Sequence, residues 1–326
     1  MNYLKLIRPL NLLIIALTMI LFRVCIVAAS PYKLFYISTV LSTLEFALLV
    51  LITITVAASG YVINDIFDVE IDAINKPHRV IVGQQISETQ AYNFYKLLCG
   101  ISILGSILLA ILTKNIRLSM LPLLLLVVLN FYAHTFKKQL IVGNFLIALL
   151  SAFVIWLIAL FETTVVSTDT DLQTQVKSGI AIAGFMYGLF AFLTTFMREI
   201  VKDLEDMEGD KAGDCNTIPF AFGIVKAKII VSAISLIILM ILSLFVWFFP
   251  SIQIKNVPVF IVILLILPLI FINILLFIAK TPKSYNFVSN LLKIYMVLGI
   301  ASLLYFRSGI GPYIFMQFAN FIEKLF

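Results

Sequence analysis

Charged residues are scarce in this chain. Of its 326 residues, 12% are Asp, Glu, Lys or Arg, whereas 62% are hydrophobic. So few polar groups cannot cover the surface of a water-soluble domain of this size, which excludes that class of protein. The basic residues form no clustered face along the sequence, and their scatter argues against a nucleic-acid partner.

Histidine and cysteine are rarer still, with two and three copies. The cysteines, Cys25, Cys99 and Cys215, are far apart and form no Cys-x-x-Cys pair. We expect Cys25 and Cys99 to pack as small apolar residues. A metal site in this chain would depend on oxygen ligands, which favour Mg²⁺ or Ca²⁺ over zinc.

Long hydrophobic runs are abundant. A helix needs about 20 mostly apolar residues to cross a bilayer. Runs of about that length predict nine transmembrane helices, at Leu10–Ala29, Val40–Ile63, Ala91–Leu112, Leu118–His134, Ile141–Phe161, Gly179–Phe196, Ile229–Phe249, Val257–Ala279 and Phe287–Phe306. The predicted fold is an all-α bundle in the lipid bilayer, formed by one domain over residues 1–326, with no sign of an obligate protein partner.

The distribution of lysine and arginine predicts the orientation in the membrane. These residues are more numerous in the alternate loops that include the N-terminus and the segments after the second and sixth runs. Cytoplasmic loops carry such an excess. We therefore expect a multi-pass protein of the cell membrane whose N-terminus and two acidic segments face the cytoplasm.

Two segments share one spacing of carboxylates, Asp-x-x-Asp-x-x-x-Asp. They are Asp65, Asp68 and Asp72 in the first segment, and Asp203, Asp206 and Asp210 in the second. On a continuous helix these positions fall within an arc of about 60°, so each segment presents one acidic stripe. Carboxylates this close need cations to stay ionised. The stripes predict a divalent-metal site that grips an anion, with Mg²⁺ shared between carboxylates and phosphate.

Basic side chains near both stripes suit a diphosphate. They are Lys76, Arg79, Lys137, Lys138, Arg198 and Lys202. Arginine contacts phosphate through two nitrogens, and lysine acts as a point charge. Because each stripe follows an even-numbered run, we predict two pseudo-repeated halves with the site between them. The segments 64–90 and 199–228 would cover that site as cytoplasmic lid loops.

Two long motifs resemble those of the UbiA superfamily of intramembrane prenyltransferases. The first is N-D-I-F-D-V-E-I-D-A-I-N-K-P-H-R at 64–79, and the second is R-E-I-V-K-D-L-E-D-M-E-G-D at 198–210. Tyr132, Lys137-Lys138 and Gly143-Asn144 are similar to the motif between them. The resemblance implies nine helices around an active site that opens to the cytoplasm. One departure is Val80-Ile81-Val82-Gly83 after Arg79, where the family usually has a proline, and it concerns the shape of the lid.

The same resemblance implies roles for individual residues. The expected Mg²⁺ ligands are Asn64, Asp68, Asp72, Asp203, Asp206 and Asp210, with Asp65 as a further ligand or a supporting residue. The expected catalytic residues are Asp68, Asp72, Asp206 and Asp210. The residues expected to bind diphosphate are Lys76, Arg79, Tyr132, Lys137, Asn144, Arg198 and Lys202. The metal ions would make the diphosphate of a polyprenyl donor a leaving group, so that an acceptor attacks the allylic carbon.

Other polar residues near the motifs allow simpler readings. By helical phase three glutamates point away from the stripes and are expected to be solvated, namely Glu70, Glu205 and Glu208. Glu199 shares the second stripe but fits equally as the partner of a neighbouring cation. Asn11 and Asn130 lie inside apolar runs, where they either contact substrate or bond one helix to another.

The acceptor stays open at the level of sequence. The second motif, with N-K-P-H-R in the first, is most similar to the branch that alkylates geranylgeranylglyceryl phosphate in ether-lipid synthesis, and this is our first prediction. Prenylation of an aromatic acceptor in quinone or related biosynthesis is the alternative, because the metal core is shared. A cation transporter is an alternative of another class, although it would place acids near the bilayer midplane. A phospholipid head-group transferase would need an Asp-Gly-x-x-Ala-Arg string, which this sequence lacks.

Overall fold

The computed structural model describes residues 2–28, 39–75, 77, 80–164, 171–251, 256–308 and 311–323. Within these residues the only extended pairing is an isolated bridge between Val82 and Ile86. The helical elements are α1 (Asn2–Leu6), α2 (Pro9–Phe22), η1 (Arg23–Val27), α3 (Thr43–Phe67), α4 (Val69–Asn75), α5 (Glu88–Thr113), α6 (Ile116–Ser119), α7 (Leu121–His134), η4 (Phe136–Lys138), α8 (Val142–Glu162), α9 (Asp171–Glu205), α10 (Met207–Ala212), α11 (Ile218–Phe222), α12 (Ile224–Ser251), α13 (Val257–Ile261), η5 (Val262–Ile266), α14 (Leu267–Ile278), α15 (Pro282–Ala301), η6 (Ser302–Ser308) and α16 (Gly311–Glu323).

Nine helical spans in the described part of the chain are long and apolar enough to cross a membrane. Each overlaps one predicted run, so the predicted bundle is confirmed. The sixth span extends over Gln173–Glu205, well past its predicted end at Phe196. That end was wrong because Arg198 and Lys202 lower the hydropathy without interrupting the backbone hydrogen bonds of α9.

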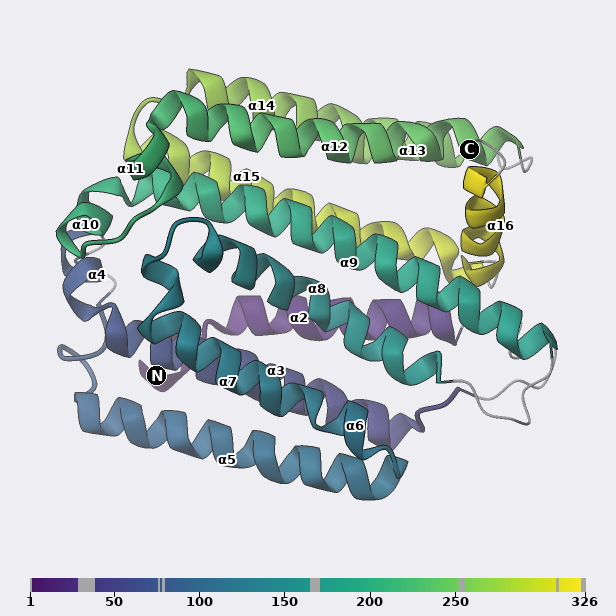
Figure 1. The fold of residues 1–326 in the computed structure, drawn as a ribbon, viewed down its shortest axis with the longest axis horizontal. Coiled ribbons are helices and arrows are strands. Elements are labelled where there is room, and N and C mark those ends of the chain that lie inside the picture. The colour runs from purple at the N-terminus through teal and green to yellow at the C-terminus, as the bar shows by residue number, and fades with distance from the viewer. Residues whose placement is uncertain are drawn as a thin grey trace.

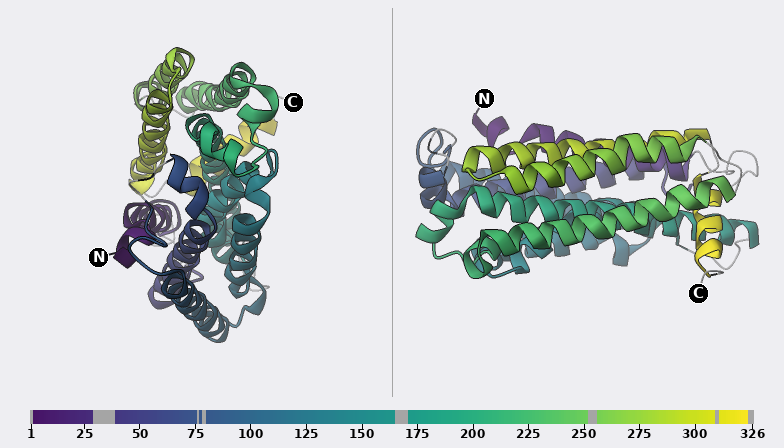
Figure 2. Two further views of the ribbon diagram at one scale, coloured as in Figure 1. Left: turned by 90° about the vertical axis from the view of Figure 1, so that its left-hand side faces the viewer. Right: turned by 90° about the horizontal axis from the view of Figure 1, so that it is seen from above.

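The long helices run side by side along one axis (Figure 1). The first and last spanning helices are neighbours, since α2 contacts α3, α8 and α15. Helix α9 packs against α8, α12, α15 and α16. Helices α4 and α10, which carry parts of the two acidic motifs, lie together at one end of the bundle (Figures 1 and 2). The topology thus brings segments more than 130 residues apart to a common place, since Asn75 and Gly209 are 134 positions apart.

Local signals explain where several of these helices begin. In a capping box, a Ser or Thr and a residue three positions later satisfy each other's backbone N–H groups. Such pairs start three helices: Ser42 and Glu45 at α3, Ser87 and Gln90 at α5, and Thr281 and Ser284 at α15.

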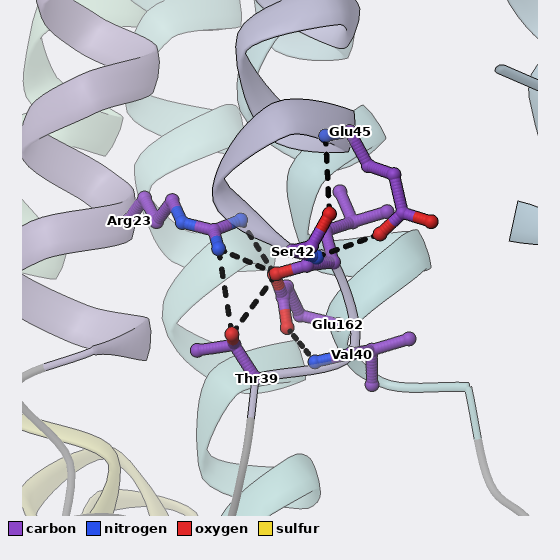
Figure 3. Close-up of polar contacts among 7 residues, drawn as sticks. Arg23, Thr39, Val40, Ser42, Glu45 and Glu162 are labelled. Atoms are coloured by element: carbon purple, nitrogen blue, oxygen red, sulfur yellow. Dashed lines mark hydrogen bonds and ion pairs between the residues drawn. The ribbon is translucent and has the colours of Figure 1, made fainter. Parts of the chain in front are cut away.

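A buried polar network joins the helices at the end opposite the motifs (Figure 3). Arg23 Nη1 donates to Glu162 Oε1 at 3.0 Å, and Arg23 Nη2 donates to the carbonyl oxygen of Leu41 at 2.5 Å. Glu162 Oε2 accepts from the backbone N–H of Val40 at 2.8 Å. The guanidinium also lies 4.4 Å from the centre of the Phe46 ring. Since Glu162 is fully buried, this network ties η1, the entry to α3 and the end of α8 together away from water.

Helix α16, near the C-terminus, lies across this same end of the bundle (Figure 1). Phe315 of α16 lines an apolar cavity together with Tyr187 and Phe190 of α9 and Phe245 of α12. The cavity extends the apolar interior along α9 on the side away from the acidic motifs.

Candidate active site

Each acidic motif lies where a long helix breaks and resumes. Asp68 separates α3 from α4 with φ −97° and ψ 5°, and Asp206 separates α9 from α10 with φ −98° and ψ 12°. This sparsely populated backbone region is often occupied at functional sites. Thr163 at the end of α8 has the same angles, φ −98° and ψ 5°, so this backbone conformation marks a helix end at each middle aspartate.

Backbone hydrogen bonds continue across both breaks. The Asp72 N–H donates to the Asp68 carbonyl at 2.8 Å, and the Asp210 N–H donates to the Asp206 carbonyl at 3.0 Å. The motifs are therefore kinked rather than straight, and the prediction of one continuous stripe on each helix was wrong. The kink carries the third aspartate of each motif onto the short helices α4 and α10.

Helices α4 and α10 meet through one hydrogen bond. The backbone N–H of Gly209 donates to Asn75 Oδ1 at 2.8 Å. Gly209 is buried, and a Cβ there would lie 2.5 Å from Asn75 Cγ. Gly213 faces Ile71 in the same way, since its Cβ would lie 2.6 Å from Ile71 Cδ1. The absence of side chains on the α10 side lets the two motif helices approach each other.

Lys137 joins the first motif to the turn between α7 and α8. Its Nζ forms an ion pair with Asp68 Oδ1, and Asn64 Nδ2 donates to Asp68 Oδ2 at 2.6 Å. Burial lowers the pKa of Lys137 to about 8, while acidic groups that include Asp210 and Asp65 act in the opposite direction. Carboxylates of both motifs thus act on the charge of Lys137. Its role at the diphosphate stays a prediction.

Asn144 holds the second motif. Its Nδ2 donates to Asp203 Oδ2 at 2.7 Å. The turn before it is strained, because Ile141 has φ 67° and the Val142 N–H bonds to the Leu140 carbonyl at 2.7 Å. A β-branched residue at positive φ costs about 1–3 kcal/mol. The turn between Lys137 and Asn144 therefore has a strained backbone. Its two ends contact different motifs, since Lys137 pairs with Asp68 and Asn144 binds Asp203.

Arg8 is a site residue that the sequence reasoning missed. Its Nη2 lies 2.6 Å from Asp65 Oδ1, and its guanidinium carbon lies 5.0 Å from the centre of the Tyr61 ring. Asp65 is thus bound as the partner of a cation in this structure. The sequence shows Arg8 directly before Pro9 at the start of the first run, where it was read only as a signal of membrane orientation.

Arg198 and Lys202, which we expected at the diphosphate, both bind Glu199. Arg198 Nη1 and Lys202 Nζ each donate to one oxygen of that carboxylate, at 2.9 Å. The reading of Glu199 as a salt-bridge partner is confirmed. Close to Arg198 lies Lys293 of α15, whose Nζ donates to Asn11 Oδ1 of α2.

Lys293 is a further residue that the sequence reasoning missed, and it lies inside the ninth span. A lysine within an apolar run is a functional signal that could have identified it. The contact of Lys293 also shows that Asn11 bonds one helix to another. Asn130 does the same, because its Nδ2 donates to the Tyr95 hydroxyl at 3.1 Å.

Tyr132 lies in the last turn of α7, directly before the turn that carries Lys137, and its role at the diphosphate stays a prediction. Lys76 and Arg79 lie outside the described residues. The expectation that Glu205 is solvated was wrong, since Asn286 Nδ2 of α15 donates to its Oε1 at 2.8 Å. Two other glutamates are exposed, as expected from helical phase: Glu70 and Glu208.

The chemistry of this site suits a hard divalent cation. The motifs supply carboxylate and amide oxygens, and Mg²⁺ prefers such ligands. In the described part of the chain, no three carboxylate, imidazole or thiol side chains converge closely enough to hold one ion. Instead Lys137 and Arg8 neutralise Asp68 and Asp65. The oxygen ligands of the motifs fit Mg²⁺. Asp68 and Asp65 stabilise the positive charges of Lys137 and Arg8 in this structure.

Comparisons with known proteins identify similar sequences. The family model described as the UbiA prenyltransferase family matches residues 19–297. Digeranylgeranylglyceryl phosphate synthase of Sulfurisphaera tokodaii is 34% identical over 68% of this chain and 71% of its own. The synthase of the same name from Sulfolobus acidocaldarius is 31% identical over 81% of this chain and 85% of its own.

Solved structures agree in fold. One, from a study of digeranylgeranylglyceryl phosphate synthase in membranes, has a TM-score of 0.64 and 26% identity, over 94% of this chain and 98% of that one. A UbiA homologue from Archaeoglobus fulgidus bound to GPP and Mg²⁺ has a TM-score of 0.59 and 16% identity, over 93% of this chain and 99% of its own. With nine membrane-spanning helices, two kinked aspartate motifs and a family match over most of its length, this chain is an integral membrane protein that belongs to the UbiA prenyltransferase family.

Proposed function

We propose that this prenyltransferase moves a geranylgeranyl group from geranylgeranyl diphosphate to geranylgeranylglyceryl phosphate, a step of ether-lipid synthesis. The observation that carries the proposal is the pairing of Asp68 with Lys137 and of Asp203 with Asn144 at one end of the bundle. The names of the similar synthases support this acceptor over an aromatic one. The excess of basic residues in alternate loops supports a cytoplasmic position for this end.

Mg²⁺ is the proposed cofactor. Asn64, Asp68 and Asp72 would hold it in the first motif, and Asp203, Asp206 and Asp210 would hold it in the second, with Asp65 beside them. Bound Mg²⁺ supplies charge neutralisation that makes diphosphate a better leaving group. The structure of an Archaeoglobus fulgidus homologue with GPP and Mg²⁺ is consistent with this cofactor.

The chain's own residues orient the donor and keep water out. Lys137 offers an ammonium to the diphosphate oxygens, with Tyr132 and Asn144 beside it, and Lys76 and Arg79 stay predicted contacts. In the reaction the bond between C1 of the prenyl group and the diphosphate oxygen breaks. The hydroxyl oxygen of the acceptor forms a new bond to C1, and its proton leaves to water or a carboxylate. The apolar helices around this end protect the cation-like carbon from water.

The proposal is tested with purified protein, Mg²⁺ and labelled geranylgeranyl diphosphate. The acceptors are geranylgeranylglyceryl phosphate, hydroxybenzoate and dihydroxynaphthoate, each in a separate reaction. We expect label in the ether lipid alone. Label in an aromatic product alone would refute the acceptor, and cation flux in liposomes without any transfer would favour the transporter alternative.

A further inference from the structure

Four cations gather on the side of the motifs where α2, α9 and α15 meet. The basic cluster consists of Arg8, Arg198, Lys202 and Lys293. Lys293 Nζ donates to Asn11 Oδ1, and Asn11 in turn hydrogen-bonds the side chain of Tyr61. Arg8 lies over the ring of the same tyrosine. This polar chain joins Lys293 of α15, Asn11 of α2 and Tyr61 of α3 to Arg8. Arg198 and Lys202 of α9 are joined to each other through Glu199.

Carboxylates only partly neutralise the basic cluster. Among the described residues, Asp65 pairs with Arg8, and the single carboxylate of Glu199 is shared by Arg198 and Lys202. Lys293 contacts a neutral amide oxygen. Asp72 and Asp203 of the motifs also act on Arg8 and Lys202, so the cluster lies between the acidic motifs and the uncharged contact of Lys293. Holding like charges together inside a membrane protein is costly, which makes such a cluster a candidate anion site.

The cluster has donors within reach of a ligand. The side chains of Arg198, Lys202 and Arg8 are 24%, 32% and 40% exposed. Arg198 Nε is buried and has no hydrogen-bond partner. An unpaired buried donor is destabilising, and a bound oxyanion would supply the missing partner.

The basic cluster lies apart from Lys137 and Asn144, and it assigns Arg198 and Lys202 to a second anion instead of the donor diphosphate, where the family resemblance placed them. Lys137 and Asn144, which bind Asp68 and Asp203, come from the turn between α7 and α8. The cluster comes instead from α2, α9 and α15, and it adjoins the motifs through Asp65 and Lys202. There is thus room for two neighbouring anions. One would bind at Lys137 and Asn144, and the other would bind at the basic cluster, which borders the acidic motifs.

We propose that the basic cluster of Arg8, Arg198, Lys202 and Lys293 binds the phosphate of the lipid acceptor. This inference rests on the proposed function, because it needs an acceptor that carries a phosphomonoester. Such a group has a charge of about −1.5 to −2 near neutral pH, which suits a cluster of four cationic side chains. Arginine supplies paired N–H donors and lysine a point charge. The cluster would select acceptors that carry phosphate and would set the position of their free hydroxyl.

The test replaces Lys293→Met and, separately, Arg198→Met, with Lys283→Met as the control. Lys283 is exposed in the first turn of α15. Binding of geranylgeranylglyceryl phosphate and of unphosphorylated geranylgeranylglycerol is measured in detergent without donor. We expect the wild-type protein and Lys283→Met to prefer the phosphorylated lipid, and each cluster variant to lose about tenfold of that preference. Lys293→Arg keeps the charge and should retain most of the preference, which separates charge from folding.

Kinetics of transfer give the second arm. In cluster variants the KM for the phosphorylated acceptor should rise about tenfold while the KM for geranylgeranyl diphosphate stays within twofold. A rise in the donor KM instead would assign the cluster to the diphosphate and overturn the inference. Equal binding of both lipids by the wild-type protein would also overturn it. If the wild-type protein prefers the phosphorylated lipid but transfers no prenyl group to it, the proposed function fails while the phosphate site stands.

Discussion

The contact between Gly209 and Asn75 allows a sharp test of how the two motifs cooperate. In Gly209→Ala the new Cβ would lie 2.5 Å from Asn75 Cγ and 2.6 Å from Asn75 Oδ1, both far inside van der Waals contact. The whole amide group would have to move, and the hydrogen bond of 2.8 Å between α4 and α10 would be lost. The third aspartate of each motif lies on these two helices, so their separation sets the distance between Asp72 and Asp210.

The expected magnitude follows from two terms. Loss of the hydrogen bond weakens the contact by about 1 kcal/mol, or about fivefold. A shift of about 1 Å between catalytic groups costs as much as 100-fold in rate. We therefore expect kcat/KM for prenyl transfer to fall by about 10- to 100-fold. Thermal stability should change little, because alanine gains up to about 1 kcal/mol over glycine in a helix and offsets the lost hydrogen bond.

Matched variants make the test specific. Gly100→Ala in α5 meets nothing within 4 Å, so its activity should equal that of the wild-type protein. Asn75→Ala removes the group that the new methyl strikes. The double variant Asn75→Ala with Gly209→Ala should therefore be more active than Gly209→Ala alone. Wild-type activity in Gly209→Ala, within twofold, would refute the idea that this contact sets the geometry of the site.

Three further predictions concern the buried network, the kinks and the metal. Arg23→Met should lower the free energy of unfolding by about 3–5 kcal/mol, because Glu162 would be left buried without its partner; a melting temperature in detergent equal to that of the wild-type protein would contradict this. Asp68→Asn and Asp206→Asn should each reduce kcat/KM at least 100-fold with an unchanged circular dichroism spectrum, and normal turnover in either would argue against equivalent roles of the two kinks. Removal of divalent ions with EDTA should abolish transfer, and Mg²⁺ should restore it while Zn²⁺ does not, because the ligands are oxygens; turnover that persists in EDTA would exclude a metal-dependent reaction.

The sequence was sufficient for much of the fold and for the location of the site. Helices that cross a bilayer must be apolar over about 20 residues, so the nine spans are visible in composition alone. Matched acidic motifs after two of them indicated one common end, and Lys137 and Asn144 do lie against the motif aspartates. Each of these features depends on a local pattern or on the motif between the two acidic segments.

Features that depend on distant contacts were not predicted. Arg8 and Asp65 are 57 positions apart, and Lys293 and Asn11 are 282 positions apart. No local periodicity connects such residues. The solvated position expected for Glu205 failed for the same reason, since its partner Asn286 comes from a later helix. Helical phase also assumed an unbroken helix, which the backbone at Asp68 and Asp206 does not follow.

The ion pair of Arg23 and Glu162 anchors α8 at the end that lies far from the acidic motifs. Asn144 precedes Glu162 by 18 positions in α8, so it lies about 27 Å from the anchored end. A tilt of about 2° about that anchor moves Asn144 by about 1 Å, the scale on which catalytic geometry is lost. The buried network thus holds the same helix that presents Asn144 to Asp203, and it does so from the opposite end of the bundle.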